Sequence, residues 1–213
     1  MTRVKICGLK TEDTLDAAIE AGADYIGLVF FPKSPRDVSA QRAAKLAARV
    51  PDCITKTALL VDPSDAALTA ILDAVDIDLL QLHGREAPER CAEIKERFNK
   101  PVMKAIGIAD ENDLPKIEAF SGIVDQLLVD AKPPKNGPLP GGNGLSFDWT
   151  LIANQNWNLP WMLAGGLTPE NVGTAIAATH ASQVDVSSGV ETGPGEKSVE
   201  LIRSFIAAAK SGA

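Results

Sequence analysis

Residues 4–9 have the sequence Val-Lys-Ile-Cys-Gly-Leu, and this stretch sets the pattern that the rest of the chain repeats. Val4 and Ile6 flank a lysine, an alternation that is typical of a short strand. Cys7 comes where that strand ends, and Gly8 allows the chain to turn away. A free cysteine is commonly a small buried hydrophobic residue. A chemical role for Cys7 therefore needs support from the rest of the sequence.

Seven further apolar stretches follow, so the sequence predicts eight strands. They are expected over residues 4–6, 25–30, 57–61, 79–82, 101–106, 123–129, 160–164 and 183–186. Capping residues, prolines and helical spacing of apolar residues after each strand predict helices. These are expected from Thr11, from Ser39 to about Arg49, from Pro63, from about Pro88, near Asp113–Phe120, from Ser146, from Thr168 and from Glu200 to Lys210.

This alternation of strands and helices, with a period of roughly 25 residues, indicates parallel βαβ units. Eight such units can close into a (β/α)8 barrel, so we predict an α/β fold in which residues 1–213 form a single TIM-barrel domain. An open doubly wound sheet is the alternative, but it normally has a glycine fingerprint after the first strand. Here the glycine-rich turns follow the sixth, seventh and eighth strands. The Pro- and Gly-rich stretch over residues 131–145 is not interpreted as a linker, because the alternation resumes after it.

Composition narrows the class of protein. The chain of 213 residues has a net charge of −7, which argues against nucleic acid as a partner. Three cysteines without CxxC spacing argue against a disulfide framework or a structural zinc site and favour a reducing compartment. We see neither a signal peptide nor an apolar stretch long enough for a membrane span. A cytoplasmic protein with no membrane partner is therefore expected.

Chemical groups fall where the predicted strands end, which is where (β/α)8 barrels have their active sites. Cys7 ends the first strand and Asp130 the sixth, so both can face one ligand from different sides. A thiolate can take a proton from carbon while a carboxylic acid gives one to oxygen. We therefore interpret Cys7 and Asp130 as catalytic candidates; for Asp130, a helix-capping carboxylate is the alternative.

Two glycine-containing turns favour a phosphate site. Gly165-Gly166 follows the seventh strand and Ser187-Ser188-Gly189 the eighth. Glycine allows a backbone N–H to approach an anion closely, and barrels often bind phosphate at these two loops. Plain tight turns would show the same residues, but both turns lie in the appropriate loops.

Three further side chains are candidates for substrate contacts. Arg36 lies in a loop with two prolines and can pair with a carboxylate through two hydrogen bonds, unless it is merely solvated. His83 ends the fourth strand, where it can bind substrate or the backbone. Asp185 lies within the eighth strand, where an acid is costly unless it points to the barrel mouth or finds a partner. His180 is expected at the surface, and no cluster has metal-ligand spacing.

With these residues in place, the sequence resembles the phosphoribosylanthranilate isomerase family of tryptophan biosynthesis along essentially its whole length. The motifs that carry the resemblance are Val4–Gly8, Phe31–Arg36, Gln81–Gly84, Leu128–Asp130, Gly141–Gly144, Ala164–Leu167 and Val184–Glu191. Two positions depart from the family pattern. Lys10 stands where a smaller polar residue is usual, and Asp37 stands where an aromatic or neutral residue is usual.

The resemblance implies a reaction and a set of roles. N-(5-phosphoribosyl)anthranilate would rearrange to 1-(2-carboxyphenylamino)-1-deoxyribulose 5-phosphate, an Amadori rearrangement without a cofactor. Asp130 would protonate the furanose ring oxygen, and Cys7 would remove the proton from ribose carbon 2. Arg36 would meet the anthranilate carboxylate, and His83 and Asp185 are expected near the substrate. The expected phosphate-binding residues are Gly142, Gly144, Gly165, Gly166, Ser187, Ser188 and Gly189.

Two other functions are compatible with parts of this pattern. The isomerase of histidine biosynthesis performs the same rearrangement with two aspartates, and Cys7 argues against it. A non-catalytic sensor of phosphoribosyl ligands would keep the glycine turns but would not need both Cys7 and Asp130. The expected partner is a small phosphorylated molecule, and the chain is expected to be a monomer or a homodimer.

Overall fold

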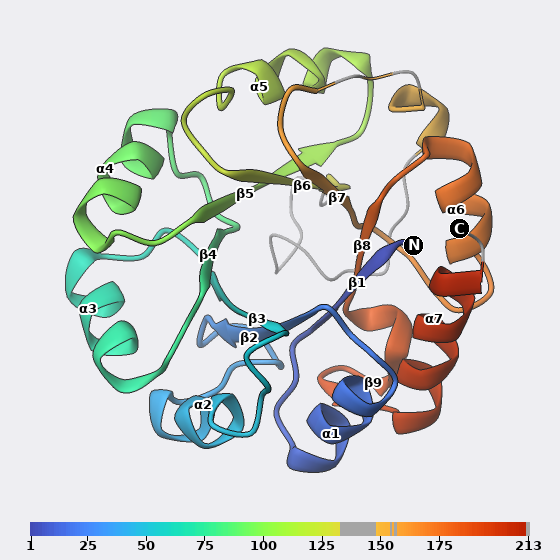
Figure 1. The fold of residues 1–213 in the computed structure, drawn as a ribbon. Helices are drawn as coiled ribbons and strands as arrows, with labels where there is room; N and C mark the ends of the chain where they lie inside the picture. The colour runs from blue at the N-terminus through green and yellow to red at the C-terminus, as the bar shows by residue number, and fades with distance from the viewer. Residues whose placement is uncertain (133–147, 154, 156, 212–213) are drawn as a thin grey trace.

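The computed structural model describes residues 1–132, 148–153, 155 and 157–211. Its centre is a closed barrel of eight parallel strands that pair in chain order, with the eighth strand beside the first. In Figure 1 the strands surround one axis and the helices lie outside them. The strands are β1 (Arg3–Cys7), β2 (Tyr25–Phe30), β3 (Thr55–Leu60), β4 (Leu79–Leu82), β5 (Val102–Ile108), β6 (Gln126–Ala131), β7 (Trp161–Leu163) and β8 (Gln183–Val186).

The predicted (β/α)8 fold is thus confirmed, and each predicted strand overlaps an observed one. Seven α-helices surround the barrel in the described part of the chain. They are α1 (Glu12–Glu20), α2 (Ala40–Ala47), α3 (Asp65–Ala74), α4 (Pro88–Phe98), α5 (Pro115–Glu118), α6 (Val172–Thr179) and α7 (Val199–Ser211). The first three begin where a hydroxyl accepts a backbone N–H, which satisfies a donor that the first helical turn leaves unpaired. The capping residues are Thr11, Ser39 and Ser64.

The helix predictions after the fifth, sixth and seventh strands were imprecise. After β5 a 3-10 helix, η1 (Glu111–Asp113), precedes the short α5. After β6 the described residues hold only another 3-10 helix, η2 (Trp149–Leu151), which Asp148 caps; Ser146 lies outside the described residues. After β7 the helix begins at Val172 rather than near Thr168, because the Asn171 amide bonds both Thr168 N–H and Gly166 O and thereby forms a turn.

A short antiparallel hairpin after β8 was not predicted. A 3-10 helix, η3 (Ser188–Val190), is followed by β9 (Glu191–Gly193) and β10 (Glu196–Lys197). Gly195 allows the turn between these strands, since its φ of +78° is disfavoured for residues with a side chain. The hairpin carries polar residues of the candidate site.

Two apolar clusters hold the barrel together. The larger lies between strands and helices and includes Val4 and Ile6, which are both fully buried. The smaller fills the barrel interior with Tyr25, Leu79, Met103, Ala105, Leu128, Met162 and Ala164. Lys5 pairs in register with Tyr25 of this inner cluster, so Lys5 and Cys7 point into the barrel while their neighbours on β1 point outward. Alternation along β1 thereby places the apolar side chains against the helices and the side chains of Lys5 and Cys7 inside the barrel.

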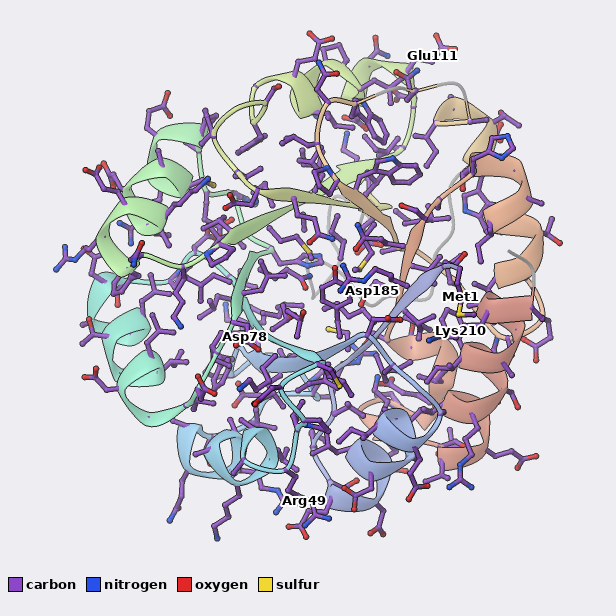
Figure 2. All side chains as sticks on the ribbon, in the orientation of Figure 1. Met1, Arg49, Asp78, Glu111, Asp185 and Lys210 are labelled. Carbon is purple, nitrogen blue, oxygen red and sulfur yellow. The ribbon has the colours of Figure 1, made fainter. Side chains whose placement is uncertain are left out.

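Polar side chains also reach into the barrel interior. Asp185 is labelled near the centre of the ring of strands in Figure 2. It stands opposite Lys5 in the β1–β8 pairing, and the two side chains form an ion pair of 2.8 Å. Among the described residues, none of the helices combines the length and the apolar character that crossing a membrane would require.

Candidate active site at the strand ends

Cys7 ends β1 as a free cysteine that is only 2% exposed. Room for its thiol comes from Gly27 on the neighbouring strand β2. A Cβ atom at Gly27 would lie 2.8 Å from Cys7 Sγ and 3.0 Å from Cys7 Cα. Cys7 is therefore buried, as a packing residue would be, but it also stands among charged groups.

Those charged groups change the pKa of the Cys7 thiol in opposite directions. Burial raises the pKa of Cys7, and the charge of Asp185 adds to the increase. The charges of Lys5 and Lys197 lower it, so that the two ammonium groups partly offset the cost of forming a buried thiolate. Lys5 itself is fully buried; burial works to lower its pKa, but Asp185 and Cys7 raise it overall, so Lys5 remains a cation.

Asp130 lies on β6 and is 8% exposed. Its Oδ1 accepts the N–H of Ala131 at 2.8 Å, and its Oδ2 lies 3.4 Å from His83 Nε2. Among the described residues it caps no helix; residues 133–147, where a helix after β6 would begin, lie outside them. Gly165 of the β7 turn is close, because a Cβ atom there would lie 3.1 Å from Asp130 Oδ1. The structure thus brings three predicted site residues together.

His83 connects Asp130 to a buried amide. Gln81 Nε2 lies 3.0 Å from His83 Nδ1. Gln81 is fully buried, and its Oε1 has no hydrogen-bond partner among the residues that the structure describes. When the amide donates to Nδ1, the proton of a neutral imidazole lies on Nε2 and faces Asp130. His83 can therefore hold a proton beside the carboxyl group.

Arg36 is 6% exposed and is paired with Glu191 in a geometry that uses two nitrogens. Arg36 Nε donates to Glu191 Oε1 at 2.7 Å, and Nη2 donates to Oε2 at 2.8 Å. The side-chain stem of Arg36 passes over Gly8, where a Cβ atom would lie 2.8 Å from Arg36 Cδ. The guanidinium is therefore a buried, oriented group next to the strand that ends in Cys7, and the alternative of a solvated arginine is excluded.

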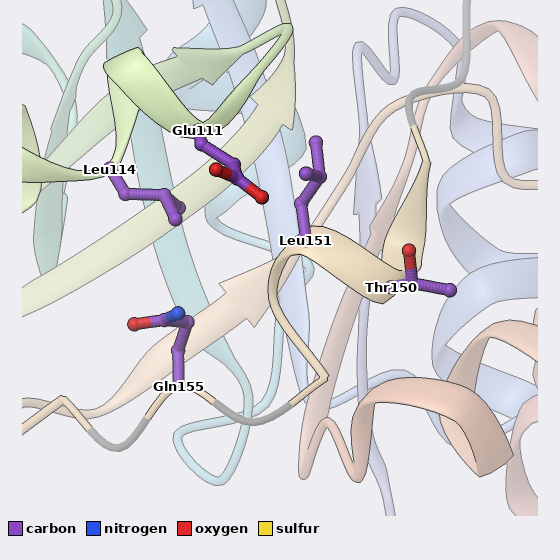
Figure 3. A pocket seen from close by; sticks show the side chains of 5 residues that line it. All are labelled: Glu111, Leu114, Thr150, Leu151 and Gln155. Carbon is purple, nitrogen blue, oxygen red and sulfur yellow. The ribbon is translucent and has the colours of Figure 1, made fainter.

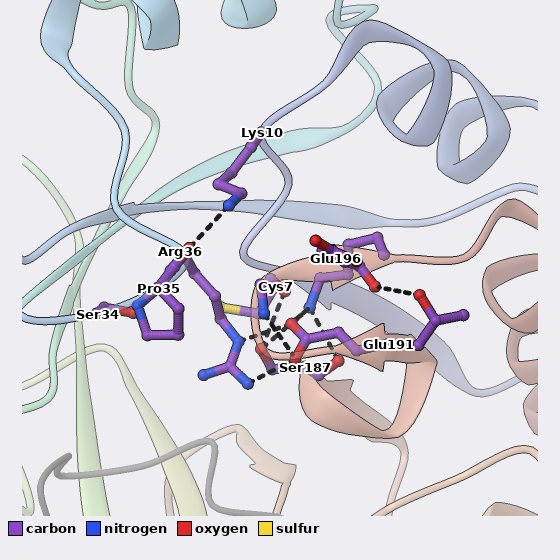
Figure 4. A network of polar contacts seen from close by, with 11 residues as sticks. Cys7, Lys10, Ser34, Pro35, Arg36, Ser187, Glu191 and Glu196 are labelled. Carbon is purple, nitrogen blue, oxygen red and sulfur yellow. Dashed lines mark hydrogen bonds and ion pairs between the residues drawn. The ribbon is translucent and has the colours of Figure 1, made fainter.

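The two departures from the family pattern both stabilise the loop of Arg36. Asp37 Oδ1 accepts the N–H of Phe31 at 2.7 Å, and Lys10 Nζ donates to Pro35 O at 2.8 Å. Neither side chain takes the place of Arg36 in the pair with Glu191. Figure 4 shows Lys10 reaching the loop from one side and Glu191 holding Arg36 from the other.

Lys197 and Glu191 come from the hairpin after β8, and the sequence analysis assigned no role to either. Both side chains are buried, at 2% and 5% exposure. Lys197 Nζ donates to Glu191 Oε1 at 2.7 Å, to Ser187 O at 2.9 Å and to Ser187 Oγ at 3.2 Å. Burial lowers the pKa of Lys197. No pattern in the sequence indicates that Lys197 lies near Cys7.

The two glycine-containing turns meet. A Cβ atom at Gly189 would lie 1.8 Å from Leu167 O, so only glycine permits this approach of the β8 turn to the β7 turn. Gly165 and Gly166 have φ values of +88° and +64°, which favour glycine as well. Ser187 Oγ donates to Cys7 O at 3.2 Å and joins the β8 turn to β1. Gly142 and Gly144, also predicted at phosphate, lie outside the described residues.

Other predicted features have clear positions. Asp185 finds a partner in Lys5, as an acid within a strand requires. His180 is exposed at the end of α6, as expected. Within the described ranges, no group of three His, Cys, Asp or Glu residues is arranged to hold a metal ion.

A hollow of about 420 Å³ lies between η1 and η2, away from the residues described above. It is lined by Glu111, Leu114, Thr150, Leu151 and Gln155 (Figure 3).

Comparisons with known proteins agree with one another. The family model described as N-(5'phosphoribosyl)anthranilate (PRA) isomerase matches residues 4–208. A relative named N-(5'-phosphoribosyl)anthranilate isomerase from Cereibacter sphaeroides is 58% identical over 208 residues, 98% of each chain. One of the same name from Paramagnetospirillum magneticum is 54% identical over 209 residues, 98% of this chain and 97% of the relative.

Solved structures give the same picture. The phosphoribosyl anthranilate isomerase of Thermotoga maritima superposes with a TM-score of 0.89 at 35% identity, over 99% of this chain and all of the other. Another structure of such an isomerase has a TM-score of 0.85 at 33% identity, over 99% and 100% of the two chains. It is a complex with reduced 1-(o-carboxyphenylamino)-1-deoxyribulose 5-phosphate.

Proposed function

The chain belongs to the N-(5'-phosphoribosyl)anthranilate isomerase family, and on this premise we propose that Cys7 is its general base and Asp130 its general acid. The reaction is the isomerisation of N-(5'-phosphoribosyl)anthranilate to 1-(2-carboxyphenylamino)-1-deoxyribulose 5-phosphate in tryptophan biosynthesis. The family membership removes the histidine-pathway isomerase and the non-catalytic sensor as alternatives.

The observation that carries these roles is the placement of Cys7 and Asp130 at the same end of one closed parallel barrel. Cys7 is the last residue of β1 and Asp130 the penultimate residue of β6, and the two strands are separated around the ring by β7 and β8. The two turns proposed for phosphate follow β7 and β8, so they lie between the two side chains. A sugar phosphate bound at these turns would have one catalytic group on each side.

In the first step, Asp130 donates a proton to the furanose ring oxygen, and the ring opens to an iminium ion. The step needs the protonated carboxyl group. The placement of His83 supports this role, because its Nε2 lies 3.4 Å from Asp130 Oδ2 and the carboxyl group therefore has an imidazole as its neighbour. Water has little access, since Asp130 is 8% exposed.

In the second step, Cys7 removes the proton from ribose carbon 2, and the enolamine then ketonises. This step needs the thiolate, although burial raises the pKa of Cys7. Lys5 and Lys197 support the role because both cations favour the thiolate. The iminium formed in the first step makes the carbon 2 proton more acidic, so the base is required only after the acid has acted.

The other proposed contacts are with the two charged ends of the substrate, the anthranilate carboxylate and the phosphate. We assign the anthranilate carboxylate to the Nη1–Nη2 edge of the Arg36 guanidinium, because Glu191 is bonded to the Nε–Nη2 edge. We assign the phosphate to Gly165, Gly166 and the turn Ser187-Ser188-Gly189, together with Gly142 and Gly144. His83 and Asp185 remain predicted substrate contacts; the partner that Asp185 has in the structure is Lys5. The cytoplasmic location and the monomeric or homodimeric state also remain predictions.

The purified protein should be mixed with freshly prepared N-(5'-phosphoribosyl)anthranilate while the loss of its fluorescence is recorded. We expect decay faster than spontaneous hydrolysis, with the rearranged sugar phosphate identified as the product. Hydrolysis without protein is the first control, and Cys7→Ala is the second. If Cys7→Ala converts substrate as fast as the unaltered protein, Cys7 is not the base.

A further inference from the structure

Among the described residues, the Glu191 carboxylate accepts four hydrogen bonds, two on each oxygen. Oε1 accepts from Arg36 Nε and Lys197 Nζ, both at 2.7 Å. Oε2 accepts from Arg36 Nη2 at 2.8 Å and from Gly195 N–H at 3.2 Å. The Glu191 side chain is 5% exposed, so these bonds are made away from solvent. Figure 4 shows that they converge beside Cys7.

The charge of Glu191 is secured by its surroundings. Burial acts to raise the pKa of Glu191, but the hydrogen bonds from Arg36 and the charge of Lys197 outweigh it, and the pKa lies below its ordinary value. Glu191 is therefore an anion across the neutral pH range. Truncation of one partner in a buried charged pair leaves the other charge uncompensated, so both cations depend on this carboxylate.

Two bonds to one carboxylate fix the plane of the Arg36 guanidinium. A single hydrogen bond would leave the guanidinium free to rotate about that bond, whereas the paired bonds to Oε1 and Oε2 remove this freedom. The stem is fixed as well, because Arg36 Cδ lies over Gly8, where even a methyl group would be too close. The direction of the Arg36 fork is thus set by Glu191 and Gly8 together.

We propose that Glu191 is a positioning residue that orients Arg36 and thereby sets the preference of the site for a ligand that carries a carboxylate on its aromatic ring. This inference rests on the proposed role of Arg36. Glu191 touches no reacting atom; it acts through the guanidinium. Through Lys197, which bonds Ser187, the same carboxylate also holds the β8 turn. Recognition of the two ends of the ligand is therefore connected through one side chain.

The test compares two ligands on two variants. The ligands are the reduced product, 1-(o-carboxyphenylamino)-1-deoxyribulose 5-phosphate with its carbonyl reduced, and the phenylamino analogue that lacks only the carboxylate. Their dissociation constants are measured by titration calorimetry. The variants are Glu191→Gln and the matched control Glu196→Gln, which makes the same chemical change at an exposed position of the same hairpin. Circular dichroism and thermal unfolding establish that each variant is folded.

In the unaltered protein we expect the carboxylated ligand to bind roughly 100-fold more tightly, since charge-assisted paired hydrogen bonds are strong. In Glu191→Gln one of the amide hydrogens must face Arg36, Lys197 or Gly195 N–H, so the guanidinium turns and the preference should fall below about tenfold. Glu196→Gln should keep the full preference. In an Arg36→Gln background, the change at Glu191 should have no further effect on the preference.

Different outcomes overturn different claims. No preference in the unaltered protein would remove Arg36 as the carboxylate-binding residue, and the present inference with it. A preference that survives in Glu191→Gln, with both ligands weakened equally, would show that Glu191 only supports the fold. If Glu191→Gln does not fold, Glu191→Asp replaces it: the shorter side chain keeps the charge but cannot reach both partners, and an undiminished preference in this variant overturns the inference.

Discussion

The two sides of the barrel mouth are built differently. On the Cys7 side, Lys5 and Asp185 form a buried ion pair of 2.8 Å, and Glu191 bonds both Arg36 and Lys197. On the Asp130 side, Oδ2 of Asp130 lies 3.4 Å from His83 Nε2. Within the described part of the chain, the adjacent Gln81 has a buried Oε1 without a partner. Short charged hydrogen bonds therefore surround Cys7, whereas the described side chain beside the Asp130 carboxyl group is a more distant imidazole.

This difference corresponds to what each step demands. A buried thiol resists ionisation, so the base needs fixed cations around it before substrate arrives. In the proposed first step Asp130 gives up a proton, and the side chain beside its carboxyl group is the imidazole of His83. We infer that the Cys7 side is preorganised by charge and that the Asp130 side is adjusted by the ligand. Substitutions on each side of the barrel mouth test this difference.

The largest effect is expected from Cys7→Ala. Without the base, kcat should fall by about 10³-fold or more, in line with the upper range for general acid–base catalysis. Affinity for the reduced product should change little, because the thiol is not assigned to binding. Steady-state fluorescence assays and calorimetry measure the two quantities. Cys53→Ala is the matched control, since Cys53 is an exposed free cysteine. A normal kcat in Cys7→Ala would remove the base from this side of the barrel.

Asp130→Asn should lower kcat by about 10²–10³-fold. The loss is expected to be smaller than that of Cys7→Ala, because the imidazole of His83 remains, with its Nε2 3.4 Å from the position of Asp130 Oδ2. The measurement is the same assay, with Asp73→Asn as a control at an exposed position of α3. If the loss exceeds that of Cys7→Ala, the Asp130 side is the more specialised one, and the comparison must be reversed.

Lys197→Met should shift the pH dependence. The charge of Lys197 lowers the pKa of Cys7, so its removal raises that pKa further and reduces the thiolate fraction at neutral pH. We expect kcat/KM at pH 7 to fall by about tenfold, which corresponds to one pKa unit. The loss should shrink as the pH rises, because the active species is the deprotonated one.

The measurement is a kcat/KM profile from pH 6 to pH 10, with Lys45→Met as a control on the exposed surface of α2. A loss of the same size at every pH would mean that Lys197 acts only by holding Ser187. Such a result would mean that the hydrogen bonds of Lys197, and not its charge, matter for the Cys7 side.

The smallest effect on the reaction, but a clear one on stability, is expected from Gly27→Ala. The new Cβ would lie 3.0 Å from the backbone at Cys7 Cα, so the strands must separate. We expect a loss of about 1–3 kcal/mol in the free energy of unfolding, typical of overpacking. Urea unfolding measures it. Gly173→Ala is the control, because a Cβ there meets no atom within 4 Å. Equal stability of Gly27→Ala and the unaltered protein would show that this side is not tightly packed.

Local patterns in the sequence were sufficient for the barrel and for the residues at the strand ends. The β1 prediction came from Val4 and Ile6, and both are buried between the strand and the helices. The same stretch also indicates that Lys5 and Cys7 share a face of β1, because they are two residues apart. By contrast, nothing local indicated Lys197 or the hairpin that carries it.

The strands and helices, and the face of each on which a residue lies, follow from the sequence alone. Side-chain direction repeats with a period of 2 residues along a strand and 3.6 residues along a helix. The pairing of charged side chains, in contrast, depends on the tertiary structure. Lys5 and Asp185 are 180 positions apart, and Arg36 and Glu191 are 155 apart. These pairs exist because β8 closes against β1, and because the hairpin after β8 returns over the barrel mouth. Ring closure and strand register depend on all eight strands at once, so no local stretch contains them.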